Sequence, residues 1–242
     1  MAALGTPGNL IVAEPLVLIG AGGFGRETAE LVRAINADRE RSSHGPAWEL
    51  LGFLDDDPEL AGTSLVGTPV LGGLDALAEL PDARVVVCTG HPGNFTSKKR
   101  IVDRLGIAPE RYATLVHPAA VISGSCRLGP GTVVLAGVVA TADVQVGAHA
   151  AVMPQAVLTH DDRLDDFVIL GAGVRIAGGV RVLEGSYLGS GCLIRENCTI
   201  GPWSLVGMGA VVTRDVPGGE VWAGVPARFV RSVEKNLARK FS

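Results

Sequence analysis

The chain has 242 residues, 47% of them apolar and 19% charged, which is enough apolar material for the core of one large domain or two small ones. The formal net charge is −4 with no dominant basic patch, which argues against a nucleic-acid partner. No apolar run reaches membrane-spanning length, and the four cysteines show neither CxxC nor zinc-finger spacing, so we expect a soluble cytoplasmic protein with reduced thiols.

Residues 1–14 lack the basic and apolar regions of a signal peptide and are expected to form a flexible N-terminus. After them, short apolar runs that predict strands alternate with amphipathic segments that predict helices, and residues 37–47 between them are interpreted as a polar loop. This alternation predicts a parallel sheet with crossover helices, an α/β Rossmann-like domain over residues 15–115. The segments, in chain order, are PLVLIG (15–20), RETAELVRAIN (26–36), WELLGFL (48–54), RVVVCTG (84–90) and FTSKKRIVDRL (95–105).

A glycine-rich motif of the form G-x-G-x-x-G, GAGGFG (20–25), joins the first strand to the first helix. In that context backbone N–H groups at a helix N-terminus can approach a phosphate closely. The second strand ends in Asp55 and Asp56, where an acid can accept a hydrogen bond from a ribose or a base. The domain is half the size of a two-lobed dinucleotide fold, which disfavours a nicotinamide cofactor. The basic run at 98–100 is interpreted as a solvated helix face rather than a phosphate contact.

From Val116 onward the apolar residues follow a period of six that never slips. A β-helix of hexapeptide repeats has this period: each hexad is one short strand and a turn, and three hexads make one triangular coil. Two sets of side chains should face inward. The large aliphatic set is Val116, Ile122, Leu128, Val134, Ala140, Val146, Val152, Leu158, Leu164, Leu170, Ile176, Val182, Leu188, Ile194, Ile200, Val206 and Val212. The mostly small set is Ala120, Cys126, Thr132, Val138, Val144, Ala150, Ala156, Asp162, Val168, Val174, Val180, Ser186, Cys192, Cys198, Ser204 and Ala210.

This pattern also accounts for the cysteines. Cys126, Cys192 and Cys198 belong to the small inward set, and Cys88 ends an apolar strand. All four are therefore expected to be buried structural thiols rather than metal or redox ligands.

Three motifs together carry a resemblance to a known family. They are VLIGAGGFGRE near the N-terminus, LVHPAAVISGS at the junction of the two patterns, and GMGAVVTRDVPGGEVWAGVPAR at the end of the hexads. With THDD (159–162) in mid-coil, the chain resembles the sialic-acid O-acetyltransferase-like branch of the hexapeptide-repeat acyltransferases, which includes N-acetyltransferases of nucleotide-linked amino sugars. The resemblance covers roughly residues 15–230.

The resemblance implies a left-handed β-helix acyltransferase domain over 116–230, a C-terminal tail over 231–242, and a homotrimer. It implies acetyl-CoA as co-substrate and no metal. The α/β domain would hold the nucleotide end of the sugar. Implied substrate contacts are Gly20, Ala21, Gly22, Gly23, Asp55, Asp56 and Gly90; implied acetyl-CoA contacts are Ile169, Gly178, Ser190 and Met208. Many relatives carry a second histidine where this chain has Ile169, which leaves the nature of the acyl group open.

His160 lies in the turn of its hexad and should point outward, whereas Asp162 occupies a small inward position. The residues alone leave two interpretations open: an acidic surface turn, or a base with an orienting carboxylate. The resemblance favours the second, with His160 as general base and Asp161 as its partner. A histidine near neutral pH suits proton removal from an attacking amine or hydroxyl, and a carboxylate fixes its tautomer. Gly178, one coil further, is the implied oxyanion donor.

Zinc-binding hexapeptide-repeat proteins, the gamma-class carbonic anhydrases, offer a metal alternative. The coil histidines His117, His149 and His160 are 32 and 11 residues apart, so no two share a face in adjacent coils, and a metal is disfavoured. His117 is expected at the start of the coil and His149 on the surface. Our main hypothesis is N-acetylation of a nucleotide-linked amino sugar by direct transfer in a ternary complex. O-acetylation of a free sugar such as a sialic acid, and a non-catalytic binding or scaffold protein, remain the alternatives.

Overall fold

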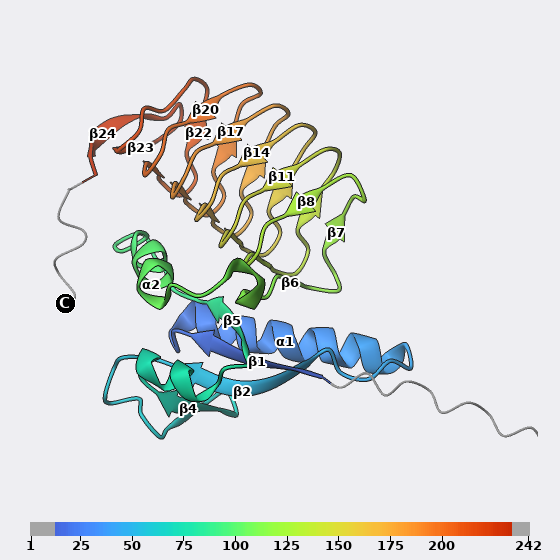
Figure 1. The fold of residues 1–242 in the computed structure, drawn as a ribbon. Helices are drawn as coiled ribbons and strands as arrows, with labels where there is room; N and C mark the ends of the chain where they lie inside the picture. The colour runs from blue at the N-terminus through green and yellow to red at the C-terminus, as the bar shows by residue number, and fades with distance from the viewer. Residues whose placement is uncertain (1–12, 234–242) are drawn as a thin grey trace, which may run out of the picture.

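The computed structural model describes residues 13–233 of the chain. The expected flexible N-terminus and C-terminal tail therefore lie almost wholly outside the described residues. An α/β part lies against one wall of a long triangular coil, and the first helix runs beneath the start of that coil (Figure 1). No helix within residues 13–233 is long and apolar enough to cross a membrane.

The α/β part is a five-stranded sheet with the order β3-β4-β2-β1-β5. All neighbours are parallel except β3 and β4, so the predicted parallel sheet is present with an antiparallel hairpin at its edge. Its elements are β1 (Glu14–Ile19), α1 (Gly23–Arg41), β2 (Trp48–Leu54), β3 (Ser64–Leu65), β4 (Thr68–Gly72), the 3-10 helix η1 (Leu74–Glu79), β5 (Arg84–Val87), α2 (Ser97–Leu105) and the 3-10 helix η2 (Pro109–Arg111).

Two local expectations were wrong. The helix α1 continues to Arg41, through residues assigned to a loop, because ADRER (37–41) consists mainly of good helix formers with two arginines at the C-terminal end. The β3–β4 hairpin was not predicted. Its strands are short and its turn places Val66 at a positive φ of 46°, so it carries neither the length nor the Asn-Gly signal of a hairpin.

The coil has three walls of short parallel strands, and each strand pairs with the strand one coil away. The first wall is β6 (Leu115–Val116), β9 (Val133–Val134), β12 (Ala151–Val152), β15 (Ile169–Leu170), β18 (Tyr187–Leu188), β21 (Leu205–Val206), β23 (Glu220–Ala223) and β24 (Arg228–Ser232), of which β24 is antiparallel to β23. The second wall is β7 (Val121–Ile122), β10 (Val139–Ala140), β13 (Val157–Leu158), β16 (Arg175–Ile176), β19 (Leu193–Ile194) and β22 (Val211–Val212). The third wall is β8 (Arg127–Leu128), β11 (Gln145–Val146), β14 (Arg163–Leu164), β17 (Arg181–Val182) and β20 (Thr199–Ile200).

The inward sets are confirmed. Every member of both sets between Thr132 and Val212 is buried, and β-strand partners such as Val139 and Val157 are eighteen residues apart. Only the first coil is partly open, so Cys126 is half-buried while Cys88, Cys192 and Cys198 are buried as expected, all with free thiols. The predicted fold class, an α/β domain followed by a left-handed parallel β-helix, is confirmed.

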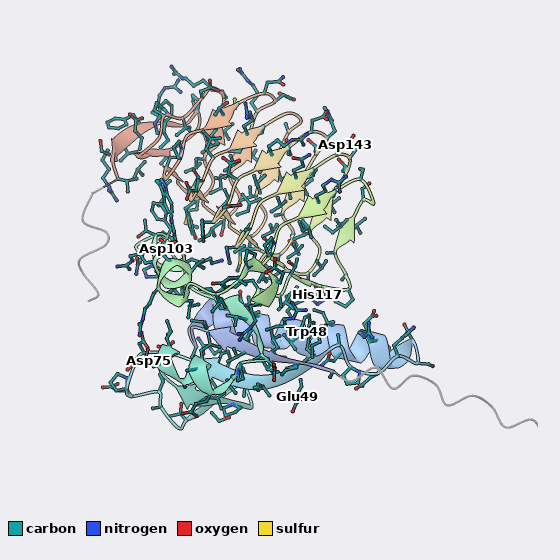
Figure 2. The ribbon with its side chains drawn as sticks, in the orientation of Figure 1. Trp48, Glu49, Asp75, Asp103, His117 and Asp143 are labelled. Atoms are coloured by element: carbon teal, nitrogen blue, oxygen red, sulfur yellow. The ribbon has the colours of Figure 1, made fainter. Side chains whose placement is uncertain are left out.

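The two parts are joined through apolar contacts along the first wall. Leu115 and Val133 share a buried cluster with the sheet of the α/β part, and Phe95 packs on Ala151 and Ile169. His117 lies at the start of the coil, close to α1 (Figure 2), and its Nδ1 accepts a hydrogen bond from the Ala119 N–H at 2.9 Å. The apolar joint places the glycine loop and the end of β5 on the same side of the molecule as the first wall.

Candidate active site

His160 and Asp161 occupy the turn between β13 and β14, where the second wall meets the third. Asp161 has a positive φ of 65°, a conformation that aspartate tolerates better than most residues. Its Oδ2 lies 2.9 Å from His160 Nδ1, and the two side chains are 61% and 68% exposed. A carboxylate at Nδ1 places the proton on that nitrogen and leaves Nε2 free to accept one.

Asp162 changes the hydrogen bonding of this turn. In the coils before and after, the N–H groups of Thr141 and Ala177 donate to strand carbonyls one coil on. Thr159 N–H instead donates to Asp162 Oδ2 at 2.9 Å, and Asp162 Oδ1 accepts from Val180 N–H at 3.0 Å. The Thr159 hydroxyl donates to the Ile176 carbonyl that its N–H has left. The carboxylate of Asp162 thus holds the backbone of the turn that carries His160.

Burial dominates the electrostatics of Asp162, which is fully inaccessible. It raises the pKa of the carboxyl to about 6, although the hydrogen bonds from Val180 and Thr159 and the nearby His160 lower it. Asp162 is therefore ionised at pH 7, directly beneath the turn that carries the imidazole.

Gly178 lies one coil beyond His160 and is in contact with its ring. A Cβ at this position would come within 2.4 Å of His160 Cε1 and Nε2, so the imidazole needs a glycine here to lie against the backbone. The Nε2 edge of the ring and the Gly178 backbone therefore share one small space, as a base and a donor acting on the same reacting centre require.

The glycine loop has two kinds of glycine. At Gly20 and Gly25 an added Cβ would meet backbone. The Cβ added at Gly25 would lie only 1.9 Å from the Gly20 carbonyl oxygen, so these two glycines are needed for the strand–helix packing. At Gly22 and Gly23 an added Cβ would meet nothing within 4 Å. These two glycines leave open space at the N-terminus of α1, where N–H groups favour an anion.

The two acids after β2 already have partners in the chain. Asp55 Oδ2 accepts a hydrogen bond from the Ala21 N–H at 2.8 Å, which fixes the glycine loop. Asp56 accepts from the Leu74 N–H and pairs with Arg104 at 2.7 Å; these contacts lower its pKa, the Leu74 hydrogen bond most. Both side chains lie at the carboxyl end of the sheet, as expected, with lone pairs left for a ligand.

The remaining expected contacts lie on other edges. Gly90, three residues after β5, has a φ of 122°, and an added Cβ would meet Ile169 Cδ1 at 2.7 Å. Ile169 is only 5% exposed, so its side chain is covered by the α/β part. Ser190 and Met208 lie where the first wall meets the second, and Met208 is 80% exposed.

A single chain therefore separates its candidate residues into three places. His160, Asp161 and Gly178 share the edge between the second and third walls, Ser190 and Met208 share the edge between the first and second, and the glycine loop lies beside the first wall. The second wall separates the first two groups.

Two residues were misjudged from the sequence. Lys98, assigned to a solvated face, is 1% exposed, and His149, expected on the surface, is 6% exposed. The signals were available: Lys98 shares helical spacing with Ile101, Val102 and Leu105, and His149 lies eighteen residues before Phe167, on which its ring stacks at 5.1 Å. The ring of His149 also meets Tyr112 edge-on at 4.5 Å.

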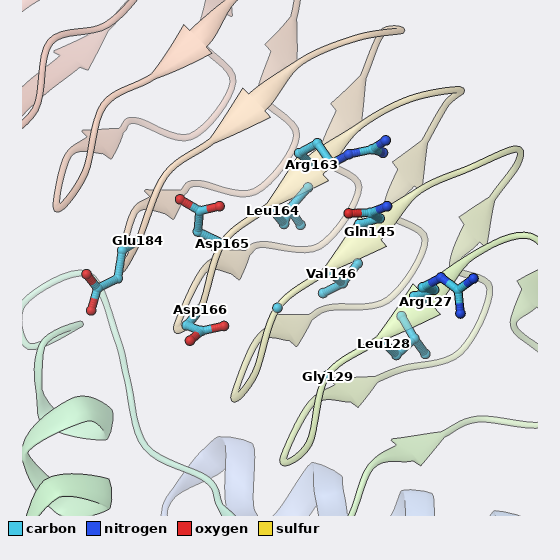
Figure 3. Close-up of a pocket in the computed structure, with 11 residues that line it drawn as sticks. Arg127, Leu128, Gly129, Gln145, Val146, Arg163, Leu164, Asp165, Asp166 and Glu184 are labelled. Atoms are coloured by element: carbon cyan, nitrogen blue, oxygen red, sulfur yellow. The ribbon is translucent and has the colours of Figure 1, made fainter. Parts of the chain in front are cut away.

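An open groove of about 550 Å³ lies on the third wall (Figure 3). Asp165, Asp166 and Glu184 gather at one end, and Arg127 and Arg163 at the other. None of the residues that line it belongs to the glycine loop. Within residues 13–233 no group of three or more His, Cys, Asp or Glu is arranged to hold a metal.

Comparison with known proteins adds to this geometry. A family model described as the PglD N-terminal domain matches residues 15–105. The chain is 32% identical over 123 residues to UDP-N-acetylbacillosamine N-acetyltransferase of Bacillus subtilis, an alignment that covers 50% of this chain and 51% of that protein. It is 26% identical over 220 residues to GDP-perosamine N-acetyltransferase of Escherichia coli O157:H7, covering 88% of this chain and 95% of that one. The structure of PerB from Caulobacter crescentus in complex with CoA and GDP-perosamine superimposes with a TM-score of 0.76 at 32% identity, covering 92% of this chain and 99% of PerB.

Proposed function

Because the chain belongs to the hexapeptide-repeat sugar N-acetyltransferases that carry a PglD N-terminal domain, we propose that it transfers the acetyl group of acetyl-CoA to the amino group of a nucleotide-linked amino sugar. The expected family membership is confirmed by the full-length likeness to PerB. The observation that carries the chemistry is the imidazole of His160, paired through Nδ1 with Asp161 and lying on Gly178.

In the proposed reaction His160 Nε2 takes a proton from the sugar amine as its nitrogen attacks the thioester carbonyl. Asp161 holds the tautomer and stabilises the imidazolium that forms. The Gly178 N–H donates to the oxyanion of the tetrahedral intermediate. Collapse of the intermediate releases the coenzyme A thiolate, which takes up the proton. Acetyl passes directly from donor to amine in a ternary complex.

We assign nucleotide binding to residues 15–115 and acyl transfer to residues 116–230. The diphosphate would lie at the open N-terminus of α1, over Gly22 and Gly23, with Ala21 and Gly90 beside it. Asp55 and Asp56 would accept from the ribose or base through their remaining lone pairs. Coenzyme A would lie along Ser190 and Met208. Ile169, also expected to contact acetyl-CoA, lies behind Gly90. The free thiols of all four cysteines favour a cytoplasmic setting.

A homotrimer is part of the proposal. The outward residues of the second wall form a column that is apolar except at Arg175, and in it Val121 is 65% and Leu193 is 42% exposed. The other members of the column are Val139, Val157, Arg175 and Val211. This wall separates the His160 edge from the Ser190 and Met208 edge, so a neighbouring copy against it would bring the two edges of different chains together.

The test is acetylation of GDP-perosamine and of UDP-linked amino sugars by the purified protein, measured through the release of the coenzyme A thiol. Sedimentation should show a trimer at micromolar concentration. In single-turnover experiments, trimeric His160→Ala should lose about 10²–10⁴-fold in rate, and Asp161→Asn should lose less because the base remains. A trimeric His160→Ala protein with near wild-type chemistry would refute the catalytic role. Acetylation of free sialic acid in preference to every sugar nucleotide would favour the O-acetyltransferase alternative.

A further inference from the structure

Lys98 is buried where the α/β part meets the coil. Of the lysines and arginines in residues 13–233 it alone is buried, at 1% exposure. Its ammonium donates to the His149 carbonyl oxygen at 3.0 Å, and within the described part of the chain it forms no ion pair with a carboxylate. A buried charge without a counter-ion lowers stability, so the position calls for an explanation other than stability.

The ammonium is a meeting point of three segments. Lys98 projects from α2, while its partner His149 lies in the turn between β11 and β12 of the coil. The ring of Phe24, which belongs to the glycine motif and lies in the first turn of α1, has its centre 5.2 Å from Nζ. Cys88, at the end of β5, and His149 are the titratable groups that face it.

The segment before α2 carries contacts that matter for the site. Gly90 lies against Ile169 of the first wall, and Phe95 packs on the same residue and on Ala151. These contacts are apolar, and apolar contact resists separation without fixing a register. The hydrogen bond from Lys98 is directional. Its acceptor, the His149 carbonyl, lies in the turn just before β12, the strand that also carries Ala151.

We propose that Lys98 is a positioning residue for the acetyl transfer: its hydrogen bond to the His149 carbonyl holds the nucleotide-binding half in register with the acyl-transfer coil. The inference rests on the proposed function, in which the sugar amine is delivered from one half to a thioester held by the other. A small change of register would leave each ligand bound but misalign the two reacting atoms, and a misplacement of about 1 Å can cost about 10²-fold in rate.

The experiment compares Lys98→Met with Lys99→Met in the full-length chain. Methionine has a similar length and no charge, so the melting temperature of Lys98→Met should be unchanged or higher. The Kd values of GDP, UDP and coenzyme A, each measured alone, should stay within about twofold, whereas kcat should fall about 10- to 100-fold. Lys99→Met removes an exposed ion pair with Asp103 and a cation–π contact with the ring of Phe167, but it leaves the Lys98 hydrogen bond in place, so it should keep wild-type kcat.

Three results would overturn the proposal: a Lys98→Met kcat within about twofold of wild type, a loss explained by weaker binding of either ligand, or an equal loss in Lys99→Met. If the wild type acetylates no sugar nucleotide, the proposed function fails and amide exchange tests the contact by itself. Exchange in α2 and residues 88–96 should then be about tenfold faster in Lys98→Met than in Lys99→Met, and equal rates would refute the contact.

Discussion

Replacing Asp162 by valine would separate the stability of the coil from the function of its turn. Residues 144 and 180, one coil before and one coil after, are both valine, so Asp162→Val restores the repeat. Burial raises the pKa of Asp162 from 3.8 to about 6. The folded protein therefore holds this proton more tightly than the unfolded chain, and the wild type loses stability as pH rises through that window. The total loss of unfolding free energy linked to this pKa shift is about 3 kcal/mol, of which about 2 kcal/mol occurs between pH 4.5 and 7.

Valine has no such dependence, so the stability of Asp162→Val relative to wild type should rise by about 2 kcal/mol from pH 4.5 to pH 7. The Thr159 and Val180 N–H groups lose their acceptor at both pH values, and this loss cancels in the comparison. Urea unfolding at equal protomer concentration measures the difference. In the same variant kcat should fall by at least about tenfold, because the turn beneath His160 can return to the pattern of its neighbours. A stability gap that stays constant with pH would refute the argument from burial.

Three further predictions test the surroundings of the site. Gly178→Ala should lower kcat about 10²-fold with little change in melting temperature. The exposed imidazole of His160 can turn away from the new methyl group, but it then loses its alignment. An unchanged kcat would contradict the contact between Gly178 and the His160 ring. Burial, with a smaller contribution from Lys98, lowers the pKa of His149 to about 4. The free energy of unfolding of the wild type should therefore fall by up to about 3 kcal/mol as pH falls from 6.5 to 4. Urea unfolding of His149→Leu should not show this loss. Burial lowers the pKa of Lys98 to about 8. The stability of the wild type relative to Lys98→Met should therefore rise by up to about 3 kcal/mol between pH 8 and 10.5. A stability difference that does not change with pH would show that the ammonium is not desolvated.

The coil could be predicted in detail because its period leaves few alternatives. A strand–turn unit of six residues repeated over many coils fixes which side chains face inward, and burial of one set forces burial of the other. The α/β part was less predictable. Helix ends depend on single capping contacts, and α1 ends at Arg41 with Ser42 as its C-cap, where a glycine would have marked the end. The β3–β4 hairpin, with strands of two and five residues, is held by tertiary contacts rather than by local preference.

The residues of the candidate site also divide into those that the repeat predicts and those that it does not. The turn of His160 and Asp161 and the place of Gly178 follow from counting hexads, since residues eighteen apart are stacked. The burial of Lys98 and His149 has a signal within each half, but their partners across the joint do not follow from the sequence. Helical spacing assigns Lys98 to the buried face of α2, yet only the structure shows that the coil offers a carbonyl there.

The residues proposed for catalysis lie where the coil departs from its own rule. Asp162 is the only charged member of the small inward set. It takes the Thr159 N–H out of the pattern that neighbouring coils follow, and it also accepts a hydrogen bond from the Val180 N–H. Burying a carboxylate lowers stability at pH 7, and nothing in the packing of the coil requires it. The buried carboxylate lowers stability without improving the packing, and it lies in the coil that also carries His160. Such local violations of a folding rule persist where function needs them, as expected of a site selected for chemistry. The same reasoning applies to Lys98, since both are buried charges that a valine or a methionine could replace. Asp162 accepts from the N–H of Thr159, the residue before His160, and Lys98 joins the α/β part to the coil.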